Sequence, residues 1–190
     1  TLYAALGFRT LVQEFAPTAE TSARHYAVVA SIEEVDDLVA RLRAAGQFGI
    51  AVVASSSSAM RADVIGWAFS ATPGTAAYIP LAHSGLLDTP NLPTADVFDR
   101  LRSLLTDESV VKVGHDLKFM TIACARQGTP LSGIGLDSMV ASYLLDATRS
   151  SHALESLALE RTNYRAMVEV DVTGKGVKAL PLVAVPPAAM

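Results

Sequence analysis

The sequence has a single cysteine and lacks both long apolar runs and clusters of basic charge. One thiol, Cys124, excludes an internal disulfide framework and fits a reducing compartment. No apolar run reaches the roughly 18 residues that a membrane helix needs, and the first residues do not resemble a signal peptide. We therefore expect a cytoplasmic protein that has no membrane partner.

The charged residues are nearly balanced in sign. Fifteen Lys and Arg residues stand against nineteen Asp and Glu residues, which gives a formal net charge of -4. The basic residues are scattered, so the sequence excludes a strong electrostatic footprint for nucleic acid. The four histidines are far apart, and without a second cysteine they offer no usual zinc-ligand spacing.

What the chain has in quantity is apolar side chains. Hydrophobic residues make up 51% and charged residues 18% of the 190 positions, enough for one domain with a good core. Nothing in the sequence demands more than a monomer. Residues 1–24 end in a stretch of small residues, which is typical of a linker.

Strand and helix patterns alternate along the rest of the chain. The expected elements are a strand at 25–31, a helix at 31–45, strands at 48–54, 63–71 and 76–81, a helix through Val97, Leu101 and Leu104 or Leu105, a strand at 110–114, and helices at 116–127, at 138–146 after the N-cap Asp137, and from about Ser151. This order predicts an α/β domain on a mixed sheet. The prolines near the end of 172–190 predict that no regular element closes the chain.

Three possible catalytic signals have simpler explanations. The serines at 55–58 have no histidine nearby and are predicted to form a turn. Residues 173–180 contain Gly-Lys but lack the spacing of a phosphate-binding loop. His115 could be a general base or a ligand, although a histidine beside a helix start is more often a hydrogen-bonding residue.

Two segments, taken together, resemble a known protein family. "VVKVGHDLKFM" at 110–120 and "GIGLDSMVASYLLDATRSSHALESLALER" at 133–161 resemble the 3′ to 5′ exonuclease domain of bacterial family A DNA polymerases, the DNA polymerase I type. "DVIGWAFS", "GTAAYIPLAH" and the opening "LGFRTLVQEFAP" are also similar to that family. The resemblance implies an α/β, ribonuclease H-like (DnaQ-like exonuclease) fold, with a mixed five-stranded sheet and helices on both faces.

The resemblance also implies a domain division. It makes residues 1–24 the linker or tail of an upstream 5′ nuclease region, and residues 25–190 an exonuclease-like domain that is truncated before its last helix. The partners would then be the upstream 5′ nuclease region and a downstream polymerase domain of the same polypeptide, with DNA bound through the parent protein.

Active members of this family are similar in holding two metal ions with four acidic residues. The resemblance places the first two acids on Ala51 and Val53 and the third on Met120, and it places the fourth beyond residue 190. None of the three side chains present can bind magnesium. We therefore expect no catalytic residue, no metal and no cofactor in this chain, and magnesium only in the parent polymerase.

Buried carboxylates without metal ions repel one another, so apolar replacements stabilise a site that no longer works. We accordingly expect Ala51 and Val53 to be ordinary core. Substitute acids could come from Asp63, Asp116 or Asp137, although turns and N-caps explain these residues as well.

Two basic residues are candidates for contact with a nucleic acid. Lys118 matches a family lysine beside the former metal site, and Arg61 lies near the serine turn. Either could contact a phosphate, although a lone basic residue is usually solvated.

The sequence predicts a catalytically inactive, non-proofreading 3′ to 5′ exonuclease-like domain that supports the polymerase domain of a DNA-directed DNA polymerase in replication and repair. One alternative is an active, metal-dependent exonuclease that uses substitute acids. Another is a free-standing module that binds protein or a single strand.

Overall fold

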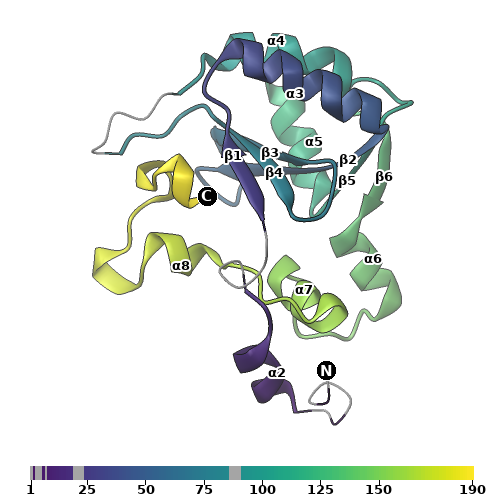
Figure 1. Ribbon diagram of the computed structural model, residues 1–190, viewed down its shortest axis with the longest axis vertical. Helices are drawn as coiled ribbons and strands as arrows, with labels where there is room; N and C mark the ends of the chain where they lie inside the picture. The colour runs from purple at the N-terminus through teal and green to yellow at the C-terminus, as the bar shows by residue number, and fades with distance from the viewer. Residues whose placement is uncertain (1, 3–5, 7, 19–23, 86–90) are drawn as a thin grey trace.

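The computed structural model describes residues 2, 6, 8–18, 24–85 and 91–190, so part of the predicted 1–24 linker lies outside the described residues. Its centre is a six-stranded sheet of order β1-β4-β3-β2-β5-β6 (Figure 1). The strands are β1 (His25–Val28), β2 (Gln47–Ala54), β3 (Val64–Ser70), β4 (Thr75–Pro80), β5 (Val111–Gly114) and β6 (Ile134–Asp137). Strands β2, β3 and β4 form an antiparallel meander. Strand β1 pairs in parallel with β4, and β5 pairs in parallel with both β2 and β6.

The mixed sheet and the meander are confirmed, but the expected count of five strands is too low by one. The additional strand is β6, which pairs with β5. It has four residues and two apolar side chains, Ile134 and Leu136. Such a segment is too short for a periodic pattern, and it becomes a strand because β5 offers it a parallel partner.

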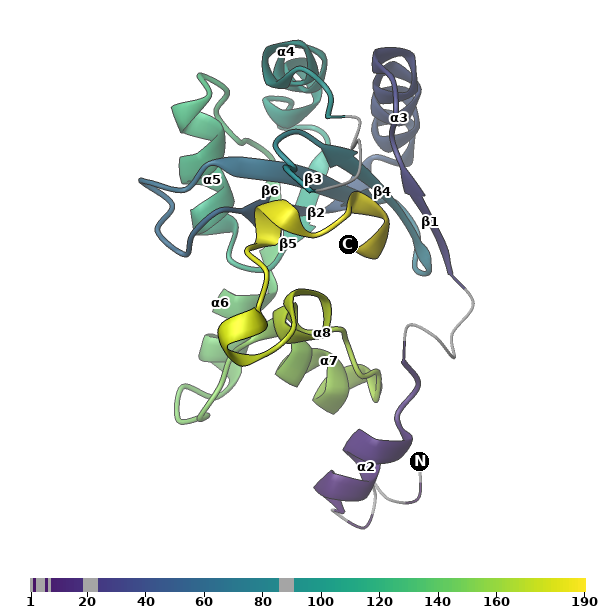
Figure 2. The same ribbon diagram turned by 90° about the vertical axis from the view of Figure 1, so that its left-hand side faces the viewer.

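The helices lie on both sides of the sheet (Figures 1 and 2). The helices α3 and α4 lie on one side, and α7 and α8 lie on the other. The helices are α2 (Arg9–Phe15), α3 (Ile32–Ala45), α4 (Thr94–Leu105), α5 (Leu117–Arg126), α6 (Ser138–Leu145), α7 (Leu154–Thr162) and α8 (Glu169–Thr173). Across the described part of the chain, every helix is too short or too polar to cross a bilayer.

Helix α3 follows from local chemistry. Ser31 Oγ accepts a hydrogen bond from the Glu34 amide at 3.2 Å, and Glu34 Oε2 accepts one from the Ala30 amide at 2.9 Å. These bonds satisfy amides that the first turn leaves without helical partners. Gly46 ends the helix in the left-handed conformation, with φ at 71°.

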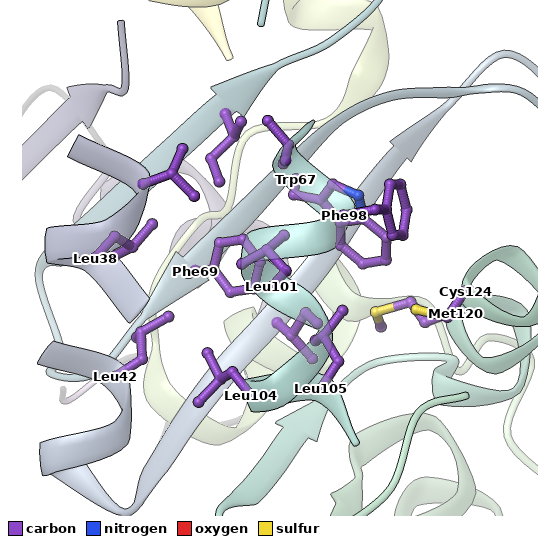
Figure 3. Close-up of a cluster of buried hydrophobic side chains, with 14 of the residues drawn as sticks. Leu38, Leu42, Trp67, Phe69, Phe98, Leu101, Leu104, Leu105, Met120 and Cys124 are labelled. Carbon is purple, nitrogen blue, oxygen red and sulfur yellow. The ribbon is translucent and has the colours of Figure 1, made fainter. Parts of the chain in front are cut away.

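The main core lies between the sheet and helices α3, α4 and α5 (Figure 3). Trp67 on β3 is fully buried, and its ring meets Phe98 of α4 edge to face at 5.9 Å. Leu38 and Leu42 of α3 are buried in the same cluster. Each large apolar side chain buried here contributes about 1.5–3 kcal/mol.

Two predictions for the C-terminal part of the chain are wrong in detail. Helix α7 starts at Leu154, later than expected, because Ser151 Oγ accepts from the Ala153 amide and holds a turn there. Residues 172–190 are more regular than predicted. They contain the end of α8 and the 3-10 helices η1 (Gly176–Lys178), η2 (Leu182–Ala184) and η3 (Pro187–Ala189). A proline is tolerated in the first turn of a helix, where its missing N–H would have no partner.

Candidate functional site

The expected acid positions on β2 lie on a different face from its core side chains. Phe48 and Ile50 are buried in the main core, whereas Ala51 is exposed and Val53 is half-buried. The expectation that Ala51 and Val53 are ordinary core is therefore wrong. Successive strand side chains alternate between faces, and the helices that enclose the main core cover the opposite face of β2.

The face of β2 that carries Ala51 forms the floor of a pocket of about 620 Å³. Small residues of the meander make this floor: Gly49, Ala51, Ala68, Ser70 and Ala76. The opposite wall includes Phe119 of α5 and Leu154 of α7. The pocket is therefore an apolar hollow, and its floor strand carries an expected acid position.

Met120 has a different environment from Ala51, although both line this pocket. Its side chain is 2% exposed and belongs to the main core, where it lies near Cys124 (Figure 3). Gly114 of β5 makes room for it, since a Cβ there would lie 3.1 Å from the Met120 methyl carbon. Burial raises the pKa of the Cys124 thiol to about 12, which makes it unreactive.

Val53 lies outside the first pocket and lines a second one, of about 600 Å³. The serine turn at 55–57 and Glu169 of α8 line the same hollow. The structure thus brings Ala51 and Met120 together, and it places Val53 at an adjoining pocket on the same strand.

Asp137 caps two helices at once, which confirms and extends its predicted role. Its carboxylate accepts from Met139 at 2.9 Å and Val140 at 3.3 Å in α6. It also accepts from Asp116 at 3.2 Å and Leu117 at 2.7 Å at the start of α5. These four amide donors occupy the oxygens that a metal ion would need.

The remaining polar groups beside the pocket have structural partners. Asp116 is the N-cap of α5 and accepts from the Phe119 amide at 3.2 Å, with φ at 55°. His115 Nδ1 lies 2.9 Å from Ser138 Oγ, which confirms its hydrogen-bonding role. Both residues line the first pocket.

The serine turn is confirmed, and a residue that sequence reasoning missed holds it. Asp63 is exposed, and its backbone N–H donates to Ser55 Oγ at 2.9 Å. The guanidinium of Arg126, at the end of α5, donates to the carbonyls of Ala59 and Ala62. No local pattern signals Arg126, because its partners lie more than 60 positions earlier in the chain.

The residues at the expected acid positions do not fit a divalent metal ion. Hard cations take oxygen ligands, whereas Ala51, Val53 and Met120 offer methyl groups and a thioether. Within the described ranges, no three His, Cys, Asp or Glu side chains are grouped so that they could hold a metal.

Lys118 and Arg61 are both exposed and line neither pocket. Lys118 lies on α5, and Arg61 lies in the loop before β3.

Comparison with known sequences gives a consistent result. Residues 91–184 match the family described as DNA polymerase I, ribonuclease H-like domain. DNA polymerase I of Pseudomonas aeruginosa is 34% identical over 157 residues, which are 82% of this chain and 17% of that protein. DNA polymerase I of Rhizobium leguminosarum is 30% identical over 169 residues, which are 80% of this chain and 16% of that protein. The chain thus spans about a sixth of these relatives.

Solved structures confirm the expected fold. The POL domain of Pol1 from M. smegmatis, in complex with DNA primer-template and dNTP, superposes with a TM-score of 0.58 at 25% identity, over 72% of this chain and 22% of that one. Escherichia coli RNase D gives a TM-score of 0.59 at 13% identity, over 83% of this chain and 38% of that one, and it supports the fold alone.

Proposed function

Because the chain belongs to the ribonuclease H-like, 3′ to 5′ exonuclease-like domain family of DNA polymerase I, we propose that it is a catalytically inactive member. It would support the polymerase domain of a longer, DNA-directed DNA polymerase. The observation that carries the proposal is the chemistry at Ala51, Val53 and Met120, where metal-binding acids are expected.

Two-metal hydrolysis requires oxygen ligands that hold both ions beside the scissile phosphate. The floor of the first pocket offers glycine, alanine and serine residues and no carboxylate. Of the candidate substitutes, Asp116 lines the pocket and accepts from the Phe119 amide, and Asp137 already accepts four backbone N–H bonds. A metal ion could use the Asp137 carboxylate only by breaking its bonds to the first amides of α5 and α6, at a cost of about 1 kcal/mol for each helix start.

A supporting role is favoured by apolar side chains exposed around α6. Val140 and Tyr143 are about half exposed, Leu144 is 84% exposed and Leu145 is 71% exposed. Monomeric proteins rarely leave large apolar patches in water, and such patches often mark an interface. Since the relatives are about six times longer than the matched segment, we assign this surface to the polymerase domain of the same polypeptide.

The proposal is tested by titrating Mn²⁺ into the purified chain and following free Mn²⁺ by electron paramagnetic resonance. The chain is compared with an Ala51→Asp, Val53→Glu double variant. A Ser70→Asp, Ala76→Asp variant is the matched control, because it adds two carboxylates to the same face away from the expected positions. We expect binding only in the first variant. Saturable, EDTA-reversible binding by the native chain would contradict the proposal.

A further inference from the structure

A buried histidine ties the end of the chain to the sheet. His83 follows β4 and is 5% exposed. Its Nδ1 lies 2.8 Å from the Val185 carbonyl oxygen, and its Nε2 lies 2.7 Å from the Tyr78 hydroxyl. Beside it, the Ser84 amide donates to the Val183 carbonyl at 2.7 Å. Figure 2 shows this terminal segment, in yellow, against the sheet near β4.

These contacts fix the proton on one ring nitrogen. A carbonyl oxygen can only accept, so Nδ1 carries the hydrogen that binds Val185. In the neutral ring Nε2 is then an acceptor, and the Tyr78 hydroxyl donates to it. If Nε2 were protonated, its N–H and the Tyr78 hydroxyl hydrogen would point at each other, and neither would have an acceptor. If the hydroxyl turned to accept instead, its own hydrogen would lose a buried partner.

We propose that His83 is a pH-sensitive latch, which holds residues 182–187 against the end of β4 while its ring is neutral and releases them when the ring is protonated. A buried imidazolium needs a counter-charge or water. The titratable side chain that is hydrogen-bonded to the ring is Tyr78, and burial raises its pKa above the usual range, so it stays neutral and supplies no counter-charge.

The covering segment is the element most easily displaced, because it consists of short 3-10 helices, whereas β4 pairs on both sides. The backbone of His83 is also fixed, since its N–H and C=O both bind the Asn91 amide group, at 2.8 and 2.7 Å. Leu182 of this segment lines the second pocket with Val53, so release of the segment would open this pocket beside β2.

The sign follows from linkage. Burial lowers the pKa of His83, so the unfolded or released state binds more protons than the latched state. The latch is therefore fully present above the ordinary histidine pKa of about 6.5 and is lost as the pH falls through the lowered value.

Amide hydrogen exchange by NMR at pH 7.5 and pH 5 tests the latch, after correction for intrinsic rates. The reporter is the Ser84 amide, and the internal reference is the Leu81 amide, which donates to Ile65 within the sheet. We expect Ser84 to lose at least about tenfold protection at pH 5 while Leu81 changes little. His83→Gln should remove this pH dependence, and His152→Gln, at another buried histidine, should retain it.

Unchanged Ser84 protection at pH 5 would overturn the proposal, as would the same pH dependence in His83→Gln. If His83→Gln does not fold, the native chain still decides. The His83 imidazole resonance is identified by its nuclear Overhauser effect to Tyr78. The pH midpoint at which Ser84 loses protection must coincide with the titration midpoint of this resonance, below pH 6.5. Separate midpoints would refute the latch, and none of these outcomes depends on nuclease activity.

Discussion

Substitution of aspartate at two of the expected acid positions should have very different effects on stability. At Ala51 the new carboxylate enters an open pocket, since the side chain is exposed. At Met120 it enters the core beside Cys124, where the native side chain is 2% exposed. The contrast tests whether Ala51 lies in an open pocket and Met120 in the core.

The magnitudes follow from burial. Removal of a buried methionine side chain costs about 2–5 kcal/mol, and a buried polar group without a partner adds about 1–3 kcal/mol. We therefore expect Met120→Asp to lower the free energy of unfolding by at least about 4 kcal/mol, a large part of the roughly 5–15 kcal/mol of a typical domain. Ala51→Asp should cost less than about 1 kcal/mol, as surface changes usually do.

Urea unfolding followed by fluorescence measures both changes. The single tryptophan, Trp67, is fully buried in the same core and serves as the probe. Met120→Leu is the volume-conserving control and should cost less than about 1.5 kcal/mol. The reasoning is refuted if Met120→Asp stays within about 1 kcal/mol of the native chain, or if Ala51→Asp is equally damaging.

Two further predictions concern stability. Gly66→Ala should destabilise the domain by about 3 kcal/mol, because the new methyl would overlap the Tyr78 ring. The control Gly49→Ala should be tolerated, because the nearest neighbour of its new methyl lies at 3.5 Å. Equal urea midpoints for the two variants would contradict this prediction. Asp137→Ala should cost about 2 kcal/mol and lower the Tm, because it uncaps α6 and removes the acceptor of the Leu117 amide at the start of α5, where the Asp116 cap remains. Unchanged hydrogen exchange at the Leu117 amide would contradict the effect on α5.

The sequence predicts elements well where local chemistry decides them. Ser31, Glu34 and Gly46 mark both ends of α3, and the apolar spacing around Leu101 marks α4. The sequence does not predict β6, which depends on a neighbour far away in the chain. It also fails at 172–190, where short 3-10 helices form despite the prolines.

The candidate site could be located but not described from the sequence. The resemblance places the acid positions, and the structure gathers Ala51 and Met120 at one pocket. Which face of β2 the helices cover is a tertiary outcome, so the exposure of Ala51 could not be inferred from its neighbours. The second helix capped by Asp137 starts 20 positions earlier, beyond the range of a local motif.

The central claim is that this domain has lost metal-dependent hydrolysis. Its most direct test is the digestion of a 3′-labelled single strand by the purified chain in manganese. The positive control restores acids by Ala51→Asp, Val53→Glu and Met120→Asp, in a longer version that carries the further helix expected after residue 190. Circular dichroism must first show that this version is folded, because Met120→Asp by itself is expected to destabilise the core. We expect degradation only by the restored version, and EDTA-sensitive degradation by the native chain would show that metal-dependent hydrolysis is retained.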